Sequence, residues 1–228
     1  MIGEDSRPDE QGWEDDATDV HRREEMVRTQ IERRGVRDPR VLAAMRAVPR
    51  HLFVPPRLRD EAYSDQALSI GHGQTISQPY IVAAMLSLLE LKGEETALDV
   101  GAGSGYQTAL LSRLASEVVA IERIPELAEA ARERLQRLGY DNVRILVGDG
   151  TGGFPDEAPF DAIVVGAGSP EVPRPLIAQL AEGGRLAIPV GDRSLQRMCL
   201  VRKEGSRVRI EDGMGCVFVP LIGEHGWN

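Results

Sequence analysis

The stretch TALDVGAGSGYQTALL (residues 96–111) joins a short apolar strand pattern, a glycine-rich turn and the start of a helix. Gly101, Gly103 and Gly105 form the turn, where glycine lets the backbone bend tightly and approach a ligand closely. The first turn of the following helix offers unpaired N–H donors to such a ligand. Since open α/β sheets bind ligands at the carboxyl ends of their strands, a nucleotide-type cofactor site is predicted here. The glycines alone also fit a tight strand–helix turn that binds nothing.

Further short apolar strands alternate with helical patterns after this turn. The strand patterns are EVVAIE (117–122), NVRILVGD (142–149), FDAIVVGAG (160–168) and GRLAIPVG (184–191), with helices expected near 125–138 and 173–180. Such interleaving is typical of a parallel sheet covered on both faces. The later stretch MCLVRKEGSRVRIED (198–212) reads instead as a hairpin that turns at residues 204–206. We therefore expect an α/β fold with a Rossmann-like, doubly wound, mostly parallel sheet and an antiparallel C-terminal edge. These patterns do not determine the order of the last strands.

The chain ahead of the sheet divides into a tail and a helical cap. Residues 1–20 are acidic and poor in aliphatic side chains, so they are expected to form a flexible tail. Residues 21–228 are expected to form a single domain. Within it, residues 21–80 would supply an N-terminal helical cap and a substrate loop, and residues 81–228 the cofactor-binding sheet and the C-terminal edge.

Two short amphipathic helices are predicted in the cap. The first spans residues 21–35 and ends at a glycine, and the second begins after Asp38, with Pro39 at its first position. The segment ALSIGHGQTISQPY (67–80) is rich in glycine and hydroxyl side chains and is expected to be a loop. A strongly apolar helix should follow it, from Pro79 to about residue 91.

Composition excludes several classes of function. The net charge of −9 argues against a broad surface that neutralises phosphates, so no nucleic-acid partner is expected. No apolar run approaches the roughly 20 residues that cross a bilayer, and the N-terminus lacks the pattern of a signal peptide. We therefore expect a cytoplasmic monomer without a membrane partner. Cys199 and Cys216 are expected to be ordinary thiols, and no histidines or cysteines have the spacing of a metal site.

Three carboxylates are candidates for binding the cofactor. Glu122 ends the second strand, about 20 residues beyond the turn, where it can accept both ribose hydroxyls or remain a solvated charge. Asp149, followed by Gly150, ends the third strand, where it can accept an adenine amine or serve as an ordinary turn residue. Asp99 precedes the glycines; it could orient the turn, meet a cationic end of the cofactor, or cap the turn's N–H groups.

The glycine spacing distinguishes between two cofactors. The turn reads G-x-G-x-G, whereas dinucleotide-binding enzymes use G-x-G-x-x-G, and Tyr106 occupies the position of their third glycine. Together with Asp99 and the Gly148-Asp149-Gly150 triplet, this spacing favours S-adenosylmethionine over a dinucleotide. A dehydrogenase is a minor alternative, because no histidine paired with an acidic residue is evident for hydride transfer.

Several motifs together resemble the protein-L-isoaspartate O-methyltransferase family, and the likeness runs from about residue 21 to residue 221. They are GQTISQPYIVAAM (73–85), LDVGAGSGYQTALL (98–111), VVAIER (118–123), VGDG (147–150), APFDAIVVGAG (158–168), VPRPLIAQLAEGGRLAIPVG (172–191) and FVPL (218–221). The glycine motif is common to many methyltransferases, whereas the T-I-S-Q-P segment is much more specific.

The resemblance implies a function and further site residues. It implies methyl transfer from S-adenosylmethionine to the free carboxylate of L-isoaspartyl residues in damaged proteins, which initiates their repair. It identifies Ser77 as the catalytic residue and places Thr75, Ile76 and Ser77 beside the transferred methyl group. The residues alone favour a capping role for Ser77, since it lies just before a helix start, and the resemblance reverses that preference. Ile222 stands where many family members have threonine after FVPL, and the ending GEHGWN is unusual.

Two other functions remain as alternatives. The chain could be an S-adenosylmethionine-dependent methyltransferase for another acceptor, such as a small-molecule carboxylate or RNA, although the acidic balance disfavours RNA. It could also be a cofactor-binding protein that has lost catalysis, against which the retained T-I-S segment and acidic residues argue.

Overall fold

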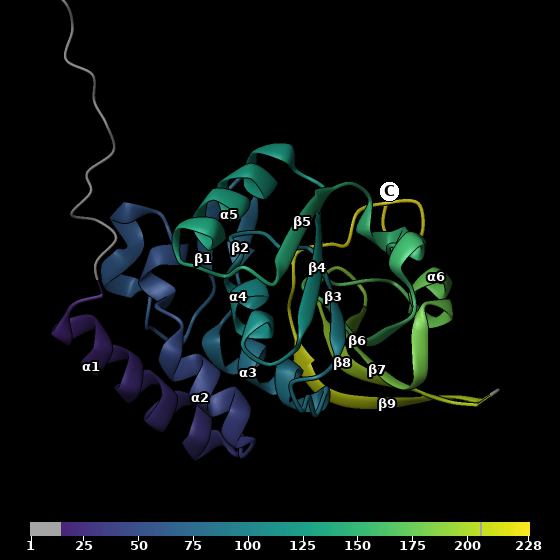
Figure 1. Cartoon of the computed structure of the whole chain (residues 1–228), viewed down its shortest axis with the longest axis horizontal. Helices are drawn as coiled ribbons and strands as arrows, with labels where there is room; N and C mark the ends of the chain where they lie inside the picture. The colour runs from purple at the N-terminus through teal and green to yellow at the C-terminus, as the bar shows by residue number, and fades with distance from the viewer. Residues whose placement is uncertain (1–14, 206) are drawn as a thin grey trace, which may run out of the picture.

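A computed structural model describes residues 15–205 and 207–228 of the chain. Its centre is a seven-stranded sheet in the order β5-β4-β3-β6-β7-β8-β9 (Figure 1). The strands are β3 (Thr96–Val100), β4 (Glu117–Glu122), β5 (Val143–Val147), β6 (Phe160–Val165), β7 (Leu180–Gly191), β8 (Gln196–Glu204) and β9 (Arg207–Cys216). The pairings from β5 through β7 are parallel, and β8 pairs antiparallel with both β7 and β9. The expected mostly parallel sheet with an antiparallel C-terminal edge is confirmed.

The sheet is covered by a different layer on each face. Three helices lie with the N-terminal cap on one face and a short helix lies on the other (Figure 1): α3 (Pro79–Leu88), α4 (Tyr106–Ser112) and α5 (Pro125–Arg137), and α6 (Arg174–Ala178). Alternate residues of β3 divide between the two cores, with Ala97 on the larger helical side and Leu98 and Val100 on the α6 side. By the same alternation, Asp99 projects toward the larger layer.

The N-terminal cap contains the two predicted helices. α1 (Ala17–Met26) continues through a π-helical turn and a 3₁₀ turn to Gly35, whose φ of 101° ends the helix in a conformation that glycine adopts readily. α2 (Pro39–Ala47) begins behind Asp38, whose carboxylate accepts the N–H groups of the first helical turn. Two 3₁₀ segments (Arg50–Phe53 and Pro56–Glu61) then lead toward the sheet.

The prediction of a flexible tail over residues 1–20 is wrong for residues 15–20, most of which lie in α1. Arg23 is only 4% exposed and donates two hydrogen bonds of 2.8 Å to the Asp15 carboxylate. A buried guanidinium requires an acceptor for its N–H groups, so it orders the acidic residue that provides one. Composition alone does not reveal such a pairing. Residues 1–14, the remainder of the predicted tail, lie outside the described residues.

The segment 67–80, expected as a loop, contains an antiparallel hairpin of β1 (Leu68–Gly71) and β2 (Gln74–Ile76). A Cβ placed on Gly103 would come within 3.3 Å of Ile70 Cδ1, so the hairpin lies directly against the glycine turn. Two strands this short are not stable alone, and packing against the turn supports them. Pairing of the two strands therefore depends on tertiary contacts, which the local sequence pattern does not reveal.

Candidate active site

The glycine turn lies where the strand order of the sheet reverses direction, between β4 on one side of β3 and β6 on the other. Gly101, Gly103 and Gly105 have φ values of 89°, 54° and 86°, which only glycine adopts without strain. A Cβ on Gly166, which follows β6, would lie 3.1 Å from the Gly101 carbonyl oxygen. The ends of β3 and β6 therefore approach each other with only backbone atoms between them. A cavity lies between these strand ends and the hairpin.

Glu122 connects the end of β4 to this turn. Its carboxylate is 6% exposed and accepts hydrogen bonds from the Gly103 N–H at 2.8 Å and from the Ile124 N–H at 2.9 Å. Each carboxylate oxygen can accept a further hydrogen bond, and Glu122 lines the cavity. Glu122 is therefore not a solvated charge at the end of a strand. It is also the residue that caps an N–H group of the glycine turn.

Asp99 has a different place from the one expected of a cofactor ligand. It is fully buried, does not line the cavity, and accepts hydrogen bonds from Gln107 Nε2 at 2.7 Å and Thr108 Oγ1 at 2.6 Å. Burial raises its pKa to about 6, against the hydrogen bonds from Thr108 and Gln107. Of the three roles considered for Asp99, the structure supports orientation of the turn, because the carboxylate fastens the start of α4 beneath the glycines.

Asp149 lies at the end of β5, beside the C-terminal segment (217–228). One carboxylate oxygen accepts the Thr151 N–H and hydroxyl, and the other accepts the Glu224 N–H at 2.8 Å. Burial alone would raise the pKa of Asp149, but these hydrogen bonds hold it below its ordinary value. The side chain is exposed, whereas its neighbour Gly150 is buried and lines the cavity.

The cavity is completed by residues that sequence reasoning did not assign. Gln74 of the hairpin and Arg123 after β4 line it, and the C-terminal segment contributes Val219 and Ile222. The Trp227 indole N–H holds that segment in place by donating to the Gly168 carbonyl oxygen at 3.0 Å. A signal existed for Gln74, Arg123 and Val219, since they lie within the motifs 73–85, 118–123 and 218–221, and Ile222 directly follows the last of these. Nothing within the motifs marked these positions as lining a cavity.

Ser77 lies between this cavity and a groove on the outer side. With Thr75 and Ile76 it lines a narrow extension of the cavity against Gly101 and Gly103. Ser77 also lines the outer groove, together with Tyr80, Met214, Val217 and Phe218. Its hydroxyl makes no hydrogen bond to any residue that the structure describes, and the residue that caps α3 is Gln78, without a side-chain bond. The structure thus contradicts the capping role and leaves the hydroxyl available to a substrate.

Gly105, His72 and the two cysteines have other surroundings. Gly105 lies at the start of α4, where a Cβ would meet Ala131 and Leu135 of α5 at 3.3–3.5 Å, so it serves close packing of the helix. His72 is exposed at the hairpin tip, with φ of 51°, and lines neither the cavity nor the groove. Cys199 and Cys216 are both buried free thiols. Among residues 15–205 and 207–228, no group of acidic, histidine or cysteine side chains could hold a metal ion.

Comparison with known proteins identifies the family. The family model described as Protein-L-isoaspartate(D-aspartate) O-methyltransferase matches residues 21–226. The chain belongs to this family. The protein-L-isoaspartate O-methyltransferase of Methanoculleus marisnigri is 57% identical over 207 residues, which cover 90% of this chain and 94% of the relative. A second, protein-L-isoaspartate O-methyltransferase 1 of Rhodopseudomonas palustris, is 56% identical over 216 residues, 93% of this chain and 88% of the relative.

Solved structures of the same family share the fold. A protein-L-isoaspartate O-methyltransferase that is 30% identical superposes with a TM-score of 0.80, covering 90% of this chain and 67% of the other. A putative family member from Plasmodium falciparum, solved in complex with S-adenosyl-L-homocysteine, is 28% identical, with a TM-score of 0.76 over 88% of this chain and 98% of the other. The α/β methyltransferase fold expected from the glycine motif is therefore confirmed for this member of the family.

Proposed function

We infer that this chain transfers a methyl group from S-adenosylmethionine to the free carboxylate of L-isoaspartyl residues in damaged proteins, which initiates their repair. The observation that carries the inference is the position of Ser77, which lines both the extension of the glycine-turn cavity and the outer groove. We name the segment Thr75, Ile76 and Ser77, which separates these two spaces, the partition. A cofactor on one side of this partition and a peptide on the other would meet at the serine. Family membership over residues 21–226 supplies the identity of both.

The cavity fits an adenosine-containing cofactor. Glycines form its floor, and a Cβ on Gly150 would lie 2.7 Å from Val100 Cγ1, so the wall there admits no side chain. Glu122 is placed to accept the ribose hydroxyls with the lone pairs that the turn does not use. Asp149 precedes Gly150, which lines the cavity, and we propose that its carboxylate accepts a hydrogen bond from the adenine amine. When bound, S-adenosylmethionine supplies an electrophilic methyl group on a positively charged sulfur.

The reaction requires little proton transfer by the protein. The free group of an isoaspartyl residue is its α-carboxyl, with a reference pKa of about 3.5, so the substrate carboxylate is already the nucleophile at neutral pH and no base has to remove a proton. The residues of the site act chiefly by proximity, holding the carboxylate oxygen against the methyl carbon. We propose that the Ser77 hydroxyl donates a hydrogen bond that aims the carboxylate, and that Thr75 and Ile76 exclude water from the partition.

The outer groove is the proposed site of the peptide. It is lined by apolar side chains of β9 and the residues after it, including Met214, Val217 and Phe218, and by Tyr80 of α3. The Arg34 guanidinium stacks 3.5 Å from the centre of the Tyr80 ring and pairs with Asp65 at 2.9 Å, so the groove has a charged rim. An open groove suits many damaged sequences, because it makes few demands on the side chains that flank the isoaspartyl residue.

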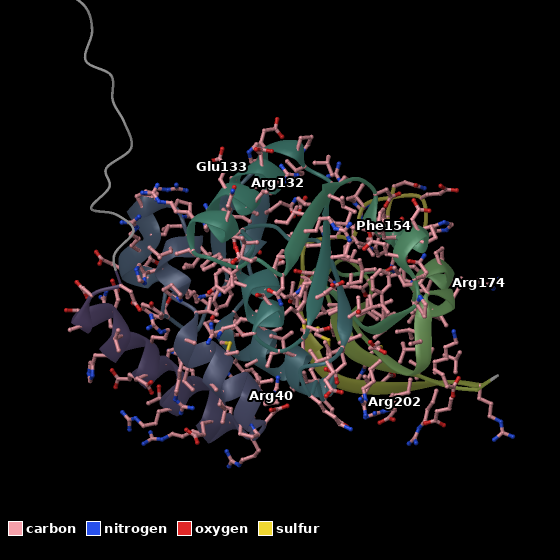
Figure 2. The ribbon with its side chains drawn as sticks, in the orientation of Figure 1. Arg40, Arg132, Glu133, Phe154, Arg174 and Arg202 are labelled. Atoms are coloured by element: carbon pink, nitrogen blue, oxygen red, sulfur yellow. The ribbon has the colours of Figure 1, made fainter. Side chains whose placement is uncertain are left out.

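We propose a cytoplasmic monomer that binds neither nucleic acid nor membrane. In Figure 2 the labelled Arg40, Arg132, Arg174 and Arg202 belong to four different elements, and Arg132 and Arg202 each pair with a glutamate. In the part of the chain that the structure describes, no helix has the length and apolar character needed to cross a membrane.

The proposed function is tested by methyl transfer from labelled S-adenosylmethionine to an isoaspartyl peptide, with the aspartyl twin as control. Base-labile label on the isoaspartyl peptide alone is expected. Equal labelling of both peptides, or labelling of neither despite cofactor binding, would contradict the function. Ser77→Ala should lower kcat about 10- to 100-fold, the value of one hydrogen bond to a charged group, and leave cofactor affinity nearly unchanged. Normal turnover by Ser77→Ala would disprove the role of the hydroxyl.

A further inference from the structure

Arg50 is a buried charge that the proposed mechanism does not use. It lies in the 3₁₀ segment Arg50–Phe53 and is completely inaccessible to solvent. Its Nε donates to the Ala62 carbonyl oxygen and its Nη2 to the Ser77 carbonyl oxygen, both at 2.8 Å. Its Nη1 is buried and has no hydrogen-bond partner in the part of the chain that the structure describes. Arginine is almost never buried completely unless it is paired, so this placement calls for an explanation.

A series of contacts that runs cation, ring, ring, cation joins Arg50 to the glycine turn. The Arg50 guanidinium lies 4.8 Å from the centre of the Tyr106 ring, and Tyr106 meets Phe53 edge-on with ring centres 5.5 Å apart. The Arg134 guanidinium lies 5.9 Å from the centre of the Phe53 ring. Its Nη1 donates to the Ser104 carbonyl oxygen at 2.8 Å. We name this set, Arg50, Tyr106, Phe53 and Arg134, the cation–aromatic ladder.

The two ends of the ladder bind the partition and the glycine turn. At one end Arg50 binds the backbone of Ser77, and at the other Arg134 binds the backbone of Ser104 in the glycine turn. Ser77, Ser104 and Tyr106 all line the narrow extension of the cavity. Phe53 and Tyr106 are each 1% exposed, so the aromatic middle of the connection is tightly packed and resists compression.

We propose that Arg50 is a positioning residue for methyl transfer, which sets the backbone of Ser77 relative to the glycine turn through the cation–aromatic ladder. The inference rests on the proposed role of the Ser77 hydroxyl. With its carbonyl held by Arg50, Ser77 can direct its hydroxyl by rotation about one side-chain bond only. Release of the carbonyl would let the residues before α3 shift, and a misplacement of about 1 Å can cost roughly 100-fold in rate.

The glycine turn has supports of its own that do not involve Arg50. Glu122 accepts the Gly103 N–H, and Arg134 donates to the Ser104 carbonyl. The cofactor side of the partition should therefore survive loss of Arg50. A positioning role consequently predicts a fall in kcat without a matching fall in cofactor affinity, whereas a general loss of folding would lower both.

Arg23 provides a matched control within the same cap. It is also buried, at 4% exposure, and donates to the Arg46 carbonyl, the Asp15 carboxylate and the Tyr63 hydroxyl. None of these acceptors lines the cavity or its extension. Replacement of either arginine removes a buried guanidinium from the cap, but only Arg50 contacts Ser77.

The test compares Arg50→Met, Arg50→Lys and Arg23→Met in the full chain. The measurements are kcat and KM for an isoaspartyl peptide, the Kd for S-adenosylhomocysteine by calorimetry, and the urea midpoint of unfolding. Arg50→Met should lower kcat about 10- to 100-fold, with the Kd unchanged within about twofold. Arg50→Lys should recover part of kcat, because an ammonium group can still donate to the Ser77 carbonyl. Arg23→Met should keep kcat at a similar loss of stability.

Equal loss of kcat in Arg50→Met and Arg23→Met, or normal kcat in Arg50→Met, would overturn the proposal. If Arg50→Met does not fold, Arg50→Lys decides through a double-mutant cycle with Ser77→Ala. Arg50→Lys should lower kcat in the native background and leave it unchanged within about twofold in the Ser77→Ala background. Equal effects in the two backgrounds would show that Arg50 does not act through Ser77. Failure of the native chain to methylate the peptide would contradict the proposed function itself, before any variant is compared.

Discussion

Replacement of Glu122 by alanine gives the sharpest prediction about cofactor binding. The carboxylate already accepts the Gly103 and Ile124 N–H groups at 2.8 and 2.9 Å, and in the proposed complex it also accepts the two ribose hydroxyls. A hydrogen bond to a charged acceptor contributes about 1.5–3 kcal/mol. Loss of two such bonds at the lower value costs about 3 kcal/mol, which corresponds to roughly 100-fold weaker binding.

The same substitution should also lower stability, and the two effects can be separated. Without Glu122, the Gly103 and Ile124 N–H groups lose their acceptor, at a cost of about 1–3 kcal/mol for each one that water does not reach. Both residues are partly accessible, so the loss should lie near the lower limit. Glu122→Gln keeps one acceptor oxygen and loses the charge, and we expect its binding to be about 10-fold weaker than native.

The assay is titration calorimetry of the full chain with S-adenosylhomocysteine, which has the same ribose as the methyl donor, alongside urea unfolding. Glu117→Ala is the control, because Glu117 begins the same strand, β4, and is exposed at its opposite end. It should bind with native affinity. If Glu122→Ala binds within about threefold of native, the ribose hydroxyls do not depend on this carboxylate and the proposed placement of the cofactor is refuted.

Two further predictions concern stability. In the folded protein Asp99 has a pKa of about 6, above the unfolded value near 4. Protonation of Asp99 therefore stabilises the folded state below pH 4, and this stabilisation is lost as the pH rises through 6. Relative to Asp99→Asn, the native chain should lose about 2 kcal/mol in urea unfolding between pH 4 and pH 7, and parallel pH profiles would contradict the raised pKa. Gly150→Ala should cost about 1–3 kcal/mol, because the new Cβ would lie 2.7 Å from Val100 Cγ1. Gly148→Ala, whose Cβ would meet no atom within 4 Å, is its control, and equal melting temperatures for the two variants would show that the wall beside Gly150 yields.

The sequence of this chain determined its sheet and the location of the cavity at its glycine turn. Short apolar strands and helices have different periodicities, and each can be recognised from neighbouring residues alone. The turn at Gly101, Gly103 and Gly105 follows from the same local rule, since left-handed backbone requires glycine there. Glu122 was also foreseeable, because the carboxyl ends of adjacent parallel strands meet at one edge of the sheet.

Only the tertiary structure decided which of the polar residues near this edge face the cavity. Asp99 and Glu122 both come from strand ends, yet Asp99 lies beneath α4 and Glu122 lines the cavity. The pairing of Arg50 with Ser77 joins residues 27 positions apart, and that of Arg23 with Asp15 ordered a segment whose composition indicated disorder. Hydrogen bonds of this kind depend on which surfaces fold against each other, and the composition around each residue does not encode that choice.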